Sequence, residues 1–382
     1  MDSSKSARDI IAKRTFFEFG TERLLSLCSA VGGDRNWAAF QNLFQRMVQP
    51  WGHRLIGDHP LYASDVADDG APFEFSLALS KEGPEVQVYM EPLGEPATPR
   101  TNMRTGRAVL EMIAGELGAP LDRLRPIEHL FFPEDPRPPF TLWIGASWAP
   151  GRDIKLKVYL NPSARGRENS LETISLAMDR LGLLRAWSAV RAKLARTDER
   201  RDEVGIVCLD LTKDDEARVK IYIRHHCATA QDIDVFARAT GEHEPEQVAA
   251  FYRILAENEG PFLGKPALTQ VALISERPDR PASTTLTFPI GKYVKNDAIA
   301  CERIKRCLTT FDLPVDAYTR ALQAFALRPL DERSGIHAHV TLRRLKSGPR
   351  VGVYFASEAY VVTAEATRPP SLQTGRWLRS SG

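Results

Sequence analysis

Short runs along the chain alternate polar and apolar residues, which is the pattern of half-buried β-strands. It is clearest from Lys155 to Asn161 and from Arg218 to Arg224, and weaker at 87–91 and 353–355. Side chains at i and i+2 point to the same face of a strand, so each of the two clear runs has one apolar face and one face of cations and tyrosine. Because this combination recurs far apart in the sequence, it favours one shared polar interior that could hold an anion and face a cation.

Strand-like runs come in five pairs, whose starts are spaced by about 65 residues, and this spacing indicates an internal repeat. The pairs are 73–80 with 85–92, 140–147 with 153–161, 204–211 with 217–224, 267–275 with 283–290, and 335–344 with 351–363. Turn residues separate the members of each pair, as in Glu82-Gly83-Pro84, Asp214-Asp215 and Ser347-Gly348-Pro349.

Helical periodicity lies between and before these pairs. Helices are predicted over 16–29, 36–48, 107–117, 171–194, 244–257 and 297–311. Ser170 is the expected N-cap of the helix over 171–194. His225-His226 is expected to follow the end of a strand and to lie in a loop.

Five hairpins give about ten antiparallel strands, and open sheets of that width tend to curl or close. If helices cover the apolar outer face, the polar face points inward. The sequence therefore predicts an α+β fold, a ten-stranded antiparallel β/α barrel with a solvated lumen and an outer ring of helices. A TIM barrel is disfavoured, because it requires one helix after each strand. Two α+β domains packed side by side are the alternative.

Composition narrows the class of protein. The formal net charge of the 382 residues is only +2, which argues against a nucleic-acid partner bound by bulk electrostatics. The five cysteines form no CxxC pair, so a reducing compartment is expected and a zinc site is not. Residues 1–15 contain no apolar signal region, and no run of about 18 apolar residues predicts a membrane span. We expect a soluble cytoplasmic protein.

Five motifs in order resemble those of dimethylallyltryptophan synthase-type aromatic prenyltransferases, and the length resembles their bacterial indole prenyltransferase branch. The motifs begin at Ala71, Lys157, Arg218, Tyr293 and Val353, and read APFEFS, KVYLNP, RVKIY, YVKND and VYFASEAY. The resemblance extends from about residue 16 to 365. It implies an antiparallel β/α barrel with its site in the lumen, and a single domain over 1–382 with terminal tails outside that core.

The resemblance also implies roles for particular residues. The diphosphate of an allylic donor would be held by Lys157, Arg218 and Lys220, and the allyl cation would be shielded by Tyr159, Tyr222 and Tyr354. Glu74 would accept the N–H of an indole and assist proton loss. An apolar strand surrounds Glu74, so the alternative is a structural carboxylate paired with a cation of the lumen.

Other positions extend or depart from the family pattern. Many relatives carry an arginine where this chain carries Gln87, and larger polar residues where it carries Thr285 and Thr287. By the alternation along its strand, Tyr89 is expected on the same face as the lumen residues. His337 and His339, with Thr341 and Arg343, are further candidates for lumen donors.

No aspartate-rich DDxxD signature, P-loop or GxGxxG occurs in the sequence. The histidine pair at i and i+2 lacks a nearby carboxylate or cysteine pattern, so we expect no metal site and no obligatory cofactor.

The leading hypothesis is an enzyme that transfers a dimethylallyl group from dimethylallyl diphosphate to a small aromatic acceptor by electrophilic aromatic substitution. The acceptor is an indole: tryptophan, a tryptophan-containing peptide or an indole metabolite of secondary metabolism. Two alternatives remain, prenylation of a phenolic acceptor and a non-catalytic carrier of an anionic small molecule.

Overall fold

Ten antiparallel strands form a closed barrel in the computed structural model, which describes residues 10–32, 37–195, 197, 201–213, 217–241 and 244–360. The strands are β1 Phe73–Ser80, β2 Gly83–Met90, β3 Leu142–Trp148, β4 Lys155–Leu160, β5 Arg201–Asp210, β6 Val219–His226, β7 Ala267–Leu273, β8 Ser283–Phe288, β9 His337–Leu345 and β10 Gly348–Ala356. Each strand pairs with its neighbours in sequence, and β1 pairs with β10 to close the barrel. The predicted fold class is confirmed.

Two of the hairpin turns, β1–β2 and β9–β10, are tighter than predicted. Only Lys81 and Glu82 separate β1 from β2, and β10 already begins at Gly348. Gly83 and Gly348 have φ angles of +102° and +119°, a region that favours glycine, so each glycine lets its strand begin directly after the turn. The predicted turn at Asp214-Asp215 and the strand end at 361–363 lie outside the described residues.

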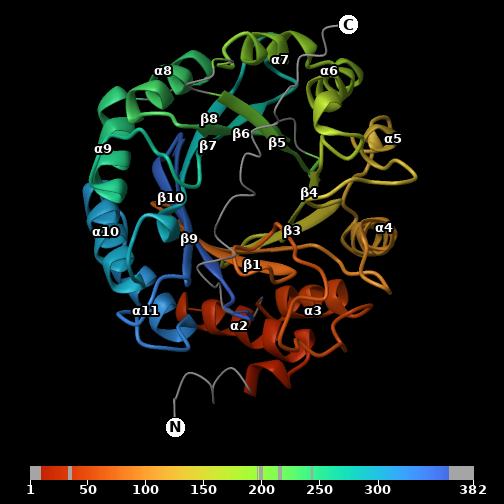
Figure 1. Cartoon of the computed structure of the whole chain (residues 1–382), viewed down its shortest axis with the longest axis vertical. Helices are drawn as coiled ribbons and strands as arrows, with labels where there is room; N and C mark the ends of the chain where they lie inside the picture. Colours follow the sequence, from red (N-terminus) through yellow and green to blue (C-terminus); the bar gives the residue numbers. More distant parts are fainter. Residues whose placement is uncertain are drawn as a thin grey trace, which may run out of the picture.

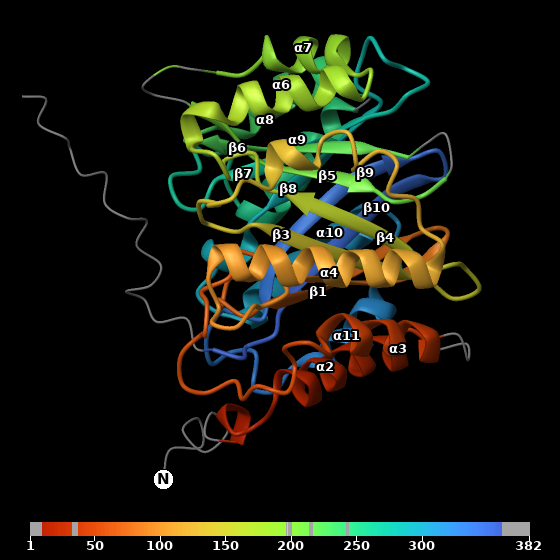
Figure 2. The same cartoon turned by 90° about the vertical axis from the view of Figure 1, so that its right-hand side faces the viewer.

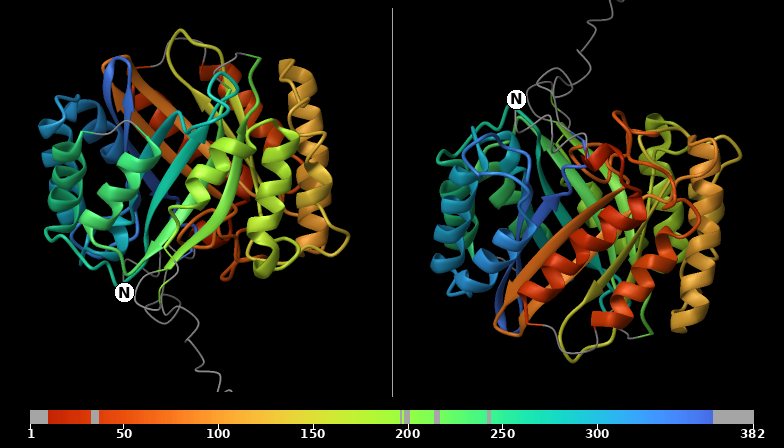
Figure 3. Two further views of the ribbon diagram at one scale, coloured as in Figure 1. Left: turned by 90° about the horizontal axis from the view of Figure 1, so that it is seen from above. Right: turned by 90° about the horizontal axis from the view of Figure 1, so that it is seen from below.

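Helices surround the barrel as an outer ring (Figures 1 and 2). They are α2 Phe16–Ala30, α3 Trp37–Val48, α4 Pro99–Leu117, α5 Glu128–Phe131, α6 Ser170–Arg180, α7 Leu184–Arg191, α8 Ala230–Thr240, α9 Pro245–Ala256, α10 Asp297–Thr310 and α11 Val315–Phe325. Two views perpendicular to that of Figure 1 show the helices lying against the outside of the strands, with α2 against β1 and β2 (Figure 3).

The prediction of one helix over 171–194 was wrong. The helix ends at Arg180, and α7 begins at Leu184. Between them Gly182 takes a φ of +71°, a conformation that ends a helix. Ser170 is not the N-cap either: it is the first helical residue, and its Oγ donates to the carbonyl of Arg167.

Three helices were not predicted: the one-turn helix α5, α8 and α11. Thr229 begins α8 with a capping box, in which its Oγ1 accepts from the amide of Asp232 at 3.1 Å and the Asp232 carboxylate accepts from the amide of Thr229 at 2.9 Å. A Thr-x-x-Asp signal was therefore present in the sequence.

The expectation that His225-His226 lies in a loop was also wrong, because β6 continues through both residues. His225 is fully buried, and its ring nitrogens contact Asp202 Oδ1 at 2.8 Å and Thr269 Oγ1 at 2.9 Å. Residues of the flanking strands β5 and β7 thus provide hydrogen-bond partners for both ring nitrogens. This allows β6 to place a polar side chain on its buried outer face, under the helices.

The main hydrophobic core lies between the barrel wall and the helices. On β6, Val219, Ile221 and Ile223 have no exposed surface, whereas the alternate residues Lys220 and Tyr222 line an inner cavity. This arrangement leaves the polar face of the strands inside the barrel, as the alternating pattern predicted.

Candidate functional site

The barrel encloses a cavity of about 320 Å³ that receives side chains from all ten strands. Most of its lining is charged, hydroxyl-bearing or tyrosine. Among the residues selected from the sequence, the cavity is lined by Gln87, Tyr89, Lys157, Tyr159, Arg218, Lys220, Tyr222, Thr285, Thr341, Arg343 and Tyr354.

A group of cations on β4 and β6 is organised by Asp210 at the end of β5. Arg218 Nε lies 2.7 Å from Asp210 Oδ2, and Lys220 Nζ lies 2.8 Å from Asp210 Oδ1. These two cations, with Lys157, hold the pKa of Asp210 well below its ordinary value despite burial. Asp210 therefore remains ionised and fixes both cationic groups at the wall of the cavity.

Lys157 lies opposite Asp210 across the β4–β5 pair. No hydrogen bond or salt bridge to its ammonium group is found within the described residues. Burial, and then the positive charge of Lys220, lower the pKa of Lys157 to about 8. The cavity thus contains a lysine ammonium that an anionic ligand would stabilise.

Arg350 on β10 was missed by the sequence analysis. It forms an ion pair with Glu85 at 2.8 Å, and it lies opposite Arg343 in the β9–β10 pair. Its phase with Gly352 and Tyr354 on one strand was the available signal, because all three line the cavity. We call Lys157, Arg218, Lys220, Arg343 and Arg350 the basic end of the lumen.

Four tyrosines form a continuous aromatic wall beside the basic end. The rings of Tyr89 and Tyr354 are stacked, with centroids 5.5 Å apart and an interplanar angle of 16°. Tyr159 lies edge-on to Tyr89 at 5.7 Å and to Tyr222 at 6.1 Å. The Tyr89 hydroxyl donates to Gln87, whose amide donates to Glu85. Gln87 thereby links the tyrosines to the Glu85–Arg350 pair.

Gly145 on β3 makes room for this wall. A Cβ atom at this position would lie 2.9 Å from Tyr159 Cε2 and 3.3 Å from Tyr89 Cδ1. We expect Gly145→Ala to displace one of the two rings and to lower the free energy of unfolding by about 1–3 kcal/mol, as overpacking commonly does. Thermal unfolding measures the cost, and Gly115→Ala is the control because a Cβ at Gly115 meets nothing within 4 Å. An unchanged melting temperature for Gly145→Ala would contradict the close packing.

Glu74 lies on β1 in register with Tyr89 on β2 and Ala356 on β10. Its side chain is 6% exposed, and its Oε1 is buried without a hydrogen-bond partner. Burial, followed by the negative charge of Asp68, raises the pKa of Glu74 well above its ordinary value. Glu74 has no salt-bridge partner among the described residues, so the structural alternative of a carboxylate paired with a lumen cation is not supported.

Charged residues outside the predicted set surround Glu74. Arg224 Nη2 lies 3.5 Å from Asp65 Oδ2, and Asp68 forms an ion pair with Lys265 and a longer contact of 3.7 Å with Lys292. Asp65 and Asp68 belong to the loop before β1, which the sequence analysis did not connect with the site. We call Glu74, Arg224, Asp65, Asp68, Lys265 and Lys292, together with His339, the Glu74 end of the lumen.

The remaining predicted positions divide between the two faces of the wall. Thr287 accepts a hydrogen bond from Gln270 Nε2 at 3.2 Å inside the barrel. His339 lies edge-on to Tyr354, with ring centroids 6.1 Å apart. His337 does not join it: its Nδ1 contacts Asp297 of α10 at 2.8 Å and its Nε2 contacts the Tyr318 hydroxyl of α11 at 2.8 Å. The expectation that His337 provides a lumen donor was therefore wrong.

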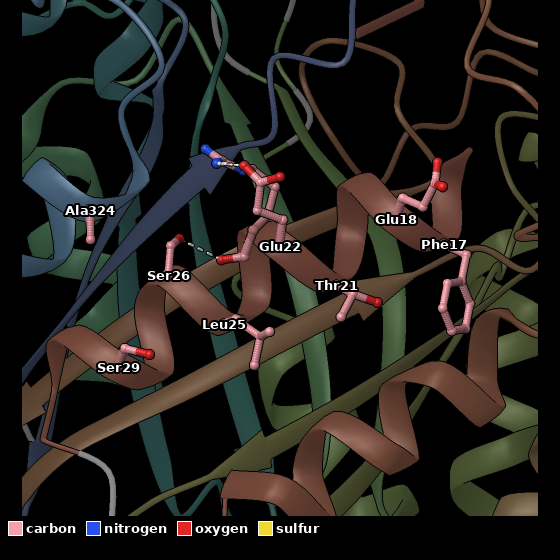
Figure 4. Close-up of a pocket in the computed structure, with 9 residues that line it drawn as sticks. Phe17, Glu18, Thr21, Glu22, Leu25, Ser26, Ser29 and Ala324 are labelled. Carbon is pink, nitrogen blue, oxygen red and sulfur yellow. Dashed lines mark hydrogen bonds and ion pairs between the residues drawn. The ribbon is translucent and has the colours of Figure 1, made fainter. Parts of the chain in front are cut away.

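A hollow of about 560 Å³ on the outside of α2 has a different character. Figure 4 shows its lining along the outer face of that helix, near Ala324. Its carboxylates already have partners: Glu18 accepts from Thr15, and Glu22 pairs with Arg14 at 2.7 Å. We therefore place the functional site in the lumen.

Within the described residues, no group of three or more His, Cys, Asp or Glu side chains is arranged to hold a metal ion. No helix in the same set has the length and apolar character needed to span a membrane.

Known proteins share this architecture. A family model described as tryptophan dimethylallyltransferase matches residues 40–320. The structure of 6-dimethylallyltryptophan synthase from Micromonospora olivasterospora, in complex with DMASPP and Trp, is 31% identical and superposes with a TM-score of 0.85 over 91% of this chain and 99% of that one. The 5-dimethylallyltryptophan synthase from Streptomyces coelicolor is 29% identical, with a TM-score of 0.83 over 92% and 99% of the two chains.

The prenyltransferase PriB, in a binary complex with product diphosphate, is 32% identical, with a TM-score of 0.84 over 91% of this chain and 98% of that one. Like the two synthases, it matches nearly the whole chain, so the resemblance read from the five sequence motifs is confirmed. The chain belongs to the tryptophan dimethylallyltransferase family of aromatic prenyltransferases.

Proposed function

We propose that the protein transfers a dimethylallyl group from dimethylallyl diphosphate to the ring of an indole, with free tryptophan as the acceptor. The observation that supports it most is the order of groups along one lumen: a cluster of cations, then a wall of tyrosines, then a buried carboxyl group. The reaction requires these groups in this order, since the leaving diphosphate, the allyl cation and the acceptor ring must lie in line.

The basic end would hold the diphosphate. Arg218 and Lys220 are fixed by Asp210, and Arg350 is fixed by Glu85, so these groups need little reorganisation when the donor binds. Lys157 has no such partner in the described part of the chain and would be neutralised by the diphosphate itself. Their positive charge stabilises the developing negative charge of the leaving group as the carbon–oxygen bond breaks.

The tyrosine wall would face the allyl cation. Each aromatic face stabilises a desolvated cation by about 2 kcal/mol or less. Burial raises the pKa of Tyr159, Tyr222 and Tyr89 well above the ordinary value, and it raises that of Tyr354 to about 12. The hydroxyls therefore stay protonated and are poor nucleophiles, so the cation is left for the indole.

Glu74 would accept the indole N–H and stabilise the positive charge that the ring acquires on attack. Beside it, Arg224 and Lys265 carry the charge needed to bind a carboxylate, while Asp65 and Asp68 carry that needed to bind an ammonium group. This pairing favours a free amino acid over a peptide or an indole without charged groups. The structures of relatives in complex with tryptophan support the same choice.

Incubation with dimethylallyl diphosphate and one acceptor at a time tests the proposal. We expect mass spectrometry to find prenylated tryptophan, with less product from a tryptophan-containing dipeptide or from a phenol. Transfer to phenols alone would support the phenolic alternative. Binding of the donor without turnover of any acceptor would support the carrier alternative.

We propose that catalysis needs no metal ion. The carboxylate oxygens of Asp210 accept hydrogen bonds from Arg218 and Lys220, and Glu85 accepts from Arg350 and Gln87. The carboxylates beside the basic end are therefore already bound to groups of the protein. We expect product formation to be unchanged within about twofold after treatment with EDTA, because protein cations replace the ion that would bind the diphosphate. Complete loss of activity that Mg²⁺ restores would contradict this prediction.

The pKa of Lys157 predicts a pH dependence for donor binding. Its neighbours are Lys220 and Arg218 on the β6 side, Asp210 on β5 and Glu85 on β2. In the empty enzyme Lys157 loses its proton as the pH rises through about 8, so donor affinity should fall above that pH. Calorimetry from pH 7 to about pH 9 measures this loss, and Lys157→Arg, which stays charged, should remove most of it. The same decrease in both proteins would reject Lys157 as its source.

We also propose that residues 1–382 act as one unit, with a core over about 16–365. The described cysteines, Cys28, Cys208, Cys227, Cys301 and Cys307, are all free, which supports a reducing compartment such as the cytoplasm.

A further inference from the structure

His339 has an unusual position at the Glu74 end of the lumen. Neither of its ring nitrogens has a hydrogen-bond partner in the ranges that the structure describes, although its ring packs edge-on against Tyr354. Two other strand histidines, His225 on β6 and His337 on β9, are each held at both ring nitrogens. His339 therefore lacks the contacts that identify a structural histidine.

A β-bulge turns His339 inward. Val340 pairs with Val353 and His337 pairs with Phe355, so two residues of β9 lie opposite Tyr354 alone. A bulge of this kind changes the face to which the following side chain points. His337 consequently faces α10 and α11, while His339 faces the lumen next to a tyrosine of the cation shield.

The proposed reaction needs a group that accepts a proton. When the ring attacks the allyl cation, the attacked carbon keeps its hydrogen, and aromaticity returns only when that proton leaves. The side chains of the basic end are cations and cannot accept this proton. The acceptor at that end would be the diphosphate that they bind. At the Glu74 end, Asp65 and Asp68 are occupied by cations.

His339 is available as a base at neutral pH. Burial, and then the positive charge of Lys265, lower its pKa to about 3 in the empty enzyme, so its ring is uncharged. Asp68 has the opposite effect and would stabilise the imidazolium once it forms. A weak base is sufficient here, because the protonated ring intermediate is itself a very strong acid.

The strand order places His339 and Glu74 on opposite sides of β10. Glu74 is on β1 and His339 is on β9, two strand spacings or about 10 Å apart across the sheet. They are also offset along the strands, because His339 lies opposite Tyr354, which pairs with Ser76. Both side chains point inward, and Tyr354 lies on β10 between their strands. An indole whose N–H is held by Glu74 would direct its benzenoid carbons toward His339.

We propose that His339 is the base that removes the ring proton after the carbon–carbon bond has formed. The inference rests on the proposed function. The donor's carbon–oxygen bond breaks with its electron pair going to the diphosphate, and a ring π pair forms the new carbon–carbon bond. The carbon–hydrogen pair then returns to the ring, and the proton moves to a ring nitrogen of His339.

Kinetic isotope effects on ring-deuterated tryptophan test this role in the full-length enzyme. For the wild type we expect a ratio of kcat values near one, because proton removal is fast. For His339→Asn and His339→Phe we expect kcat to fall about 100-fold and the ratio to rise above about two, because proton removal becomes rate-limiting. The Phe variant keeps an aromatic ring against Tyr354, so it separates the loss of the base from the loss of packing.

Controls keep the outcomes distinct. Calorimetric Kd values for tryptophan and for a non-ionising thio-analogue of the donor should change less than about threefold in both variants. His129→Asn should match the wild type, because His129 is an exposed residue of the outer helix α5. A lower kcat without an isotope effect, or an isotope effect in Glu74→Gln alone, would overturn the role of His339. A wild type that forms no prenylated tryptophan would instead overturn the proposed function and this inference with it.

Discussion

We expect Glu74→Gln to lower kcat about 100-fold or more while leaving the Kd of the donor nearly unchanged. Glutamine keeps the size of the side chain and an oxygen that can accept the indole N–H, so the loss reports the missing negative charge. That charge is needed when the ring attacks, because the indole nitrogen then becomes positive. Steady-state kinetics with tryptophan and calorimetry with the donor separate the two quantities.

The pH profile of the same variant provides a second test. The pKa of Glu74 is raised, so a larger fraction of the wild type is uncharged at low pH, and kcat should rise with pH as the carboxyl group ionises. In Glu74→Gln this rise should be absent. The control is Glu134→Gln, since Glu134 is exposed and pairs with the exposed Arg100. A glutamine variant with wild-type kcat, or with the same pH profile, would remove Glu74 from the reaction.

We expect Arg218→Ala and Lys220→Ala each to weaken donor binding about 10- to 100-fold. A charge-assisted hydrogen bond contributes about 1.5–3 kcal/mol, and each 1.4 kcal/mol changes an equilibrium constant tenfold. The two effects should not be additive, because both cations share the carboxylate of Asp210. In the double variant Asp210 loses both partners and its negative charge repels the diphosphate, so binding should weaken more than the sum of the single losses.

Calorimetry with the thio-analogue of the donor measures these constants without turnover. The control is Lys193→Ala, at an exposed lysine after α7 on the outside of the barrel. The Kd of tryptophan should change little, because the charged residues nearest Glu74 do not include Arg218 or Lys220. Unchanged donor affinity in the single variants would exclude both residues from the diphosphate site.

Local patterns predicted the barrel because they are set by neighbours along the chain. Alternation in 155–161 and 218–224 fixed which side chains share a face, and the turn residues between paired runs fixed the hairpins. The prediction of an element or of a side chain's direction failed where the local sequence signal was weak or was not used. Gly182 divided the predicted helix over 171–194, and the bulge beside Tyr354 sent His337 and His339 to opposite faces.

The sequence by itself determined the number of hairpins, the polar inner face and most of the cations and tyrosines that it carries. Only the tertiary structure decided which of these residues meet. Closure of β1 against β10 is needed before Glu85 can pair with Arg350, 265 positions later, and Asp65 reaches Arg224 across 159 positions. Periodicity fixes the face of a strand, but contacts between remote strands depend on their register around the closed barrel. For the same reason Arg350, Asp65 and the free ring of His339 became visible as parts of the site only in the folded chain.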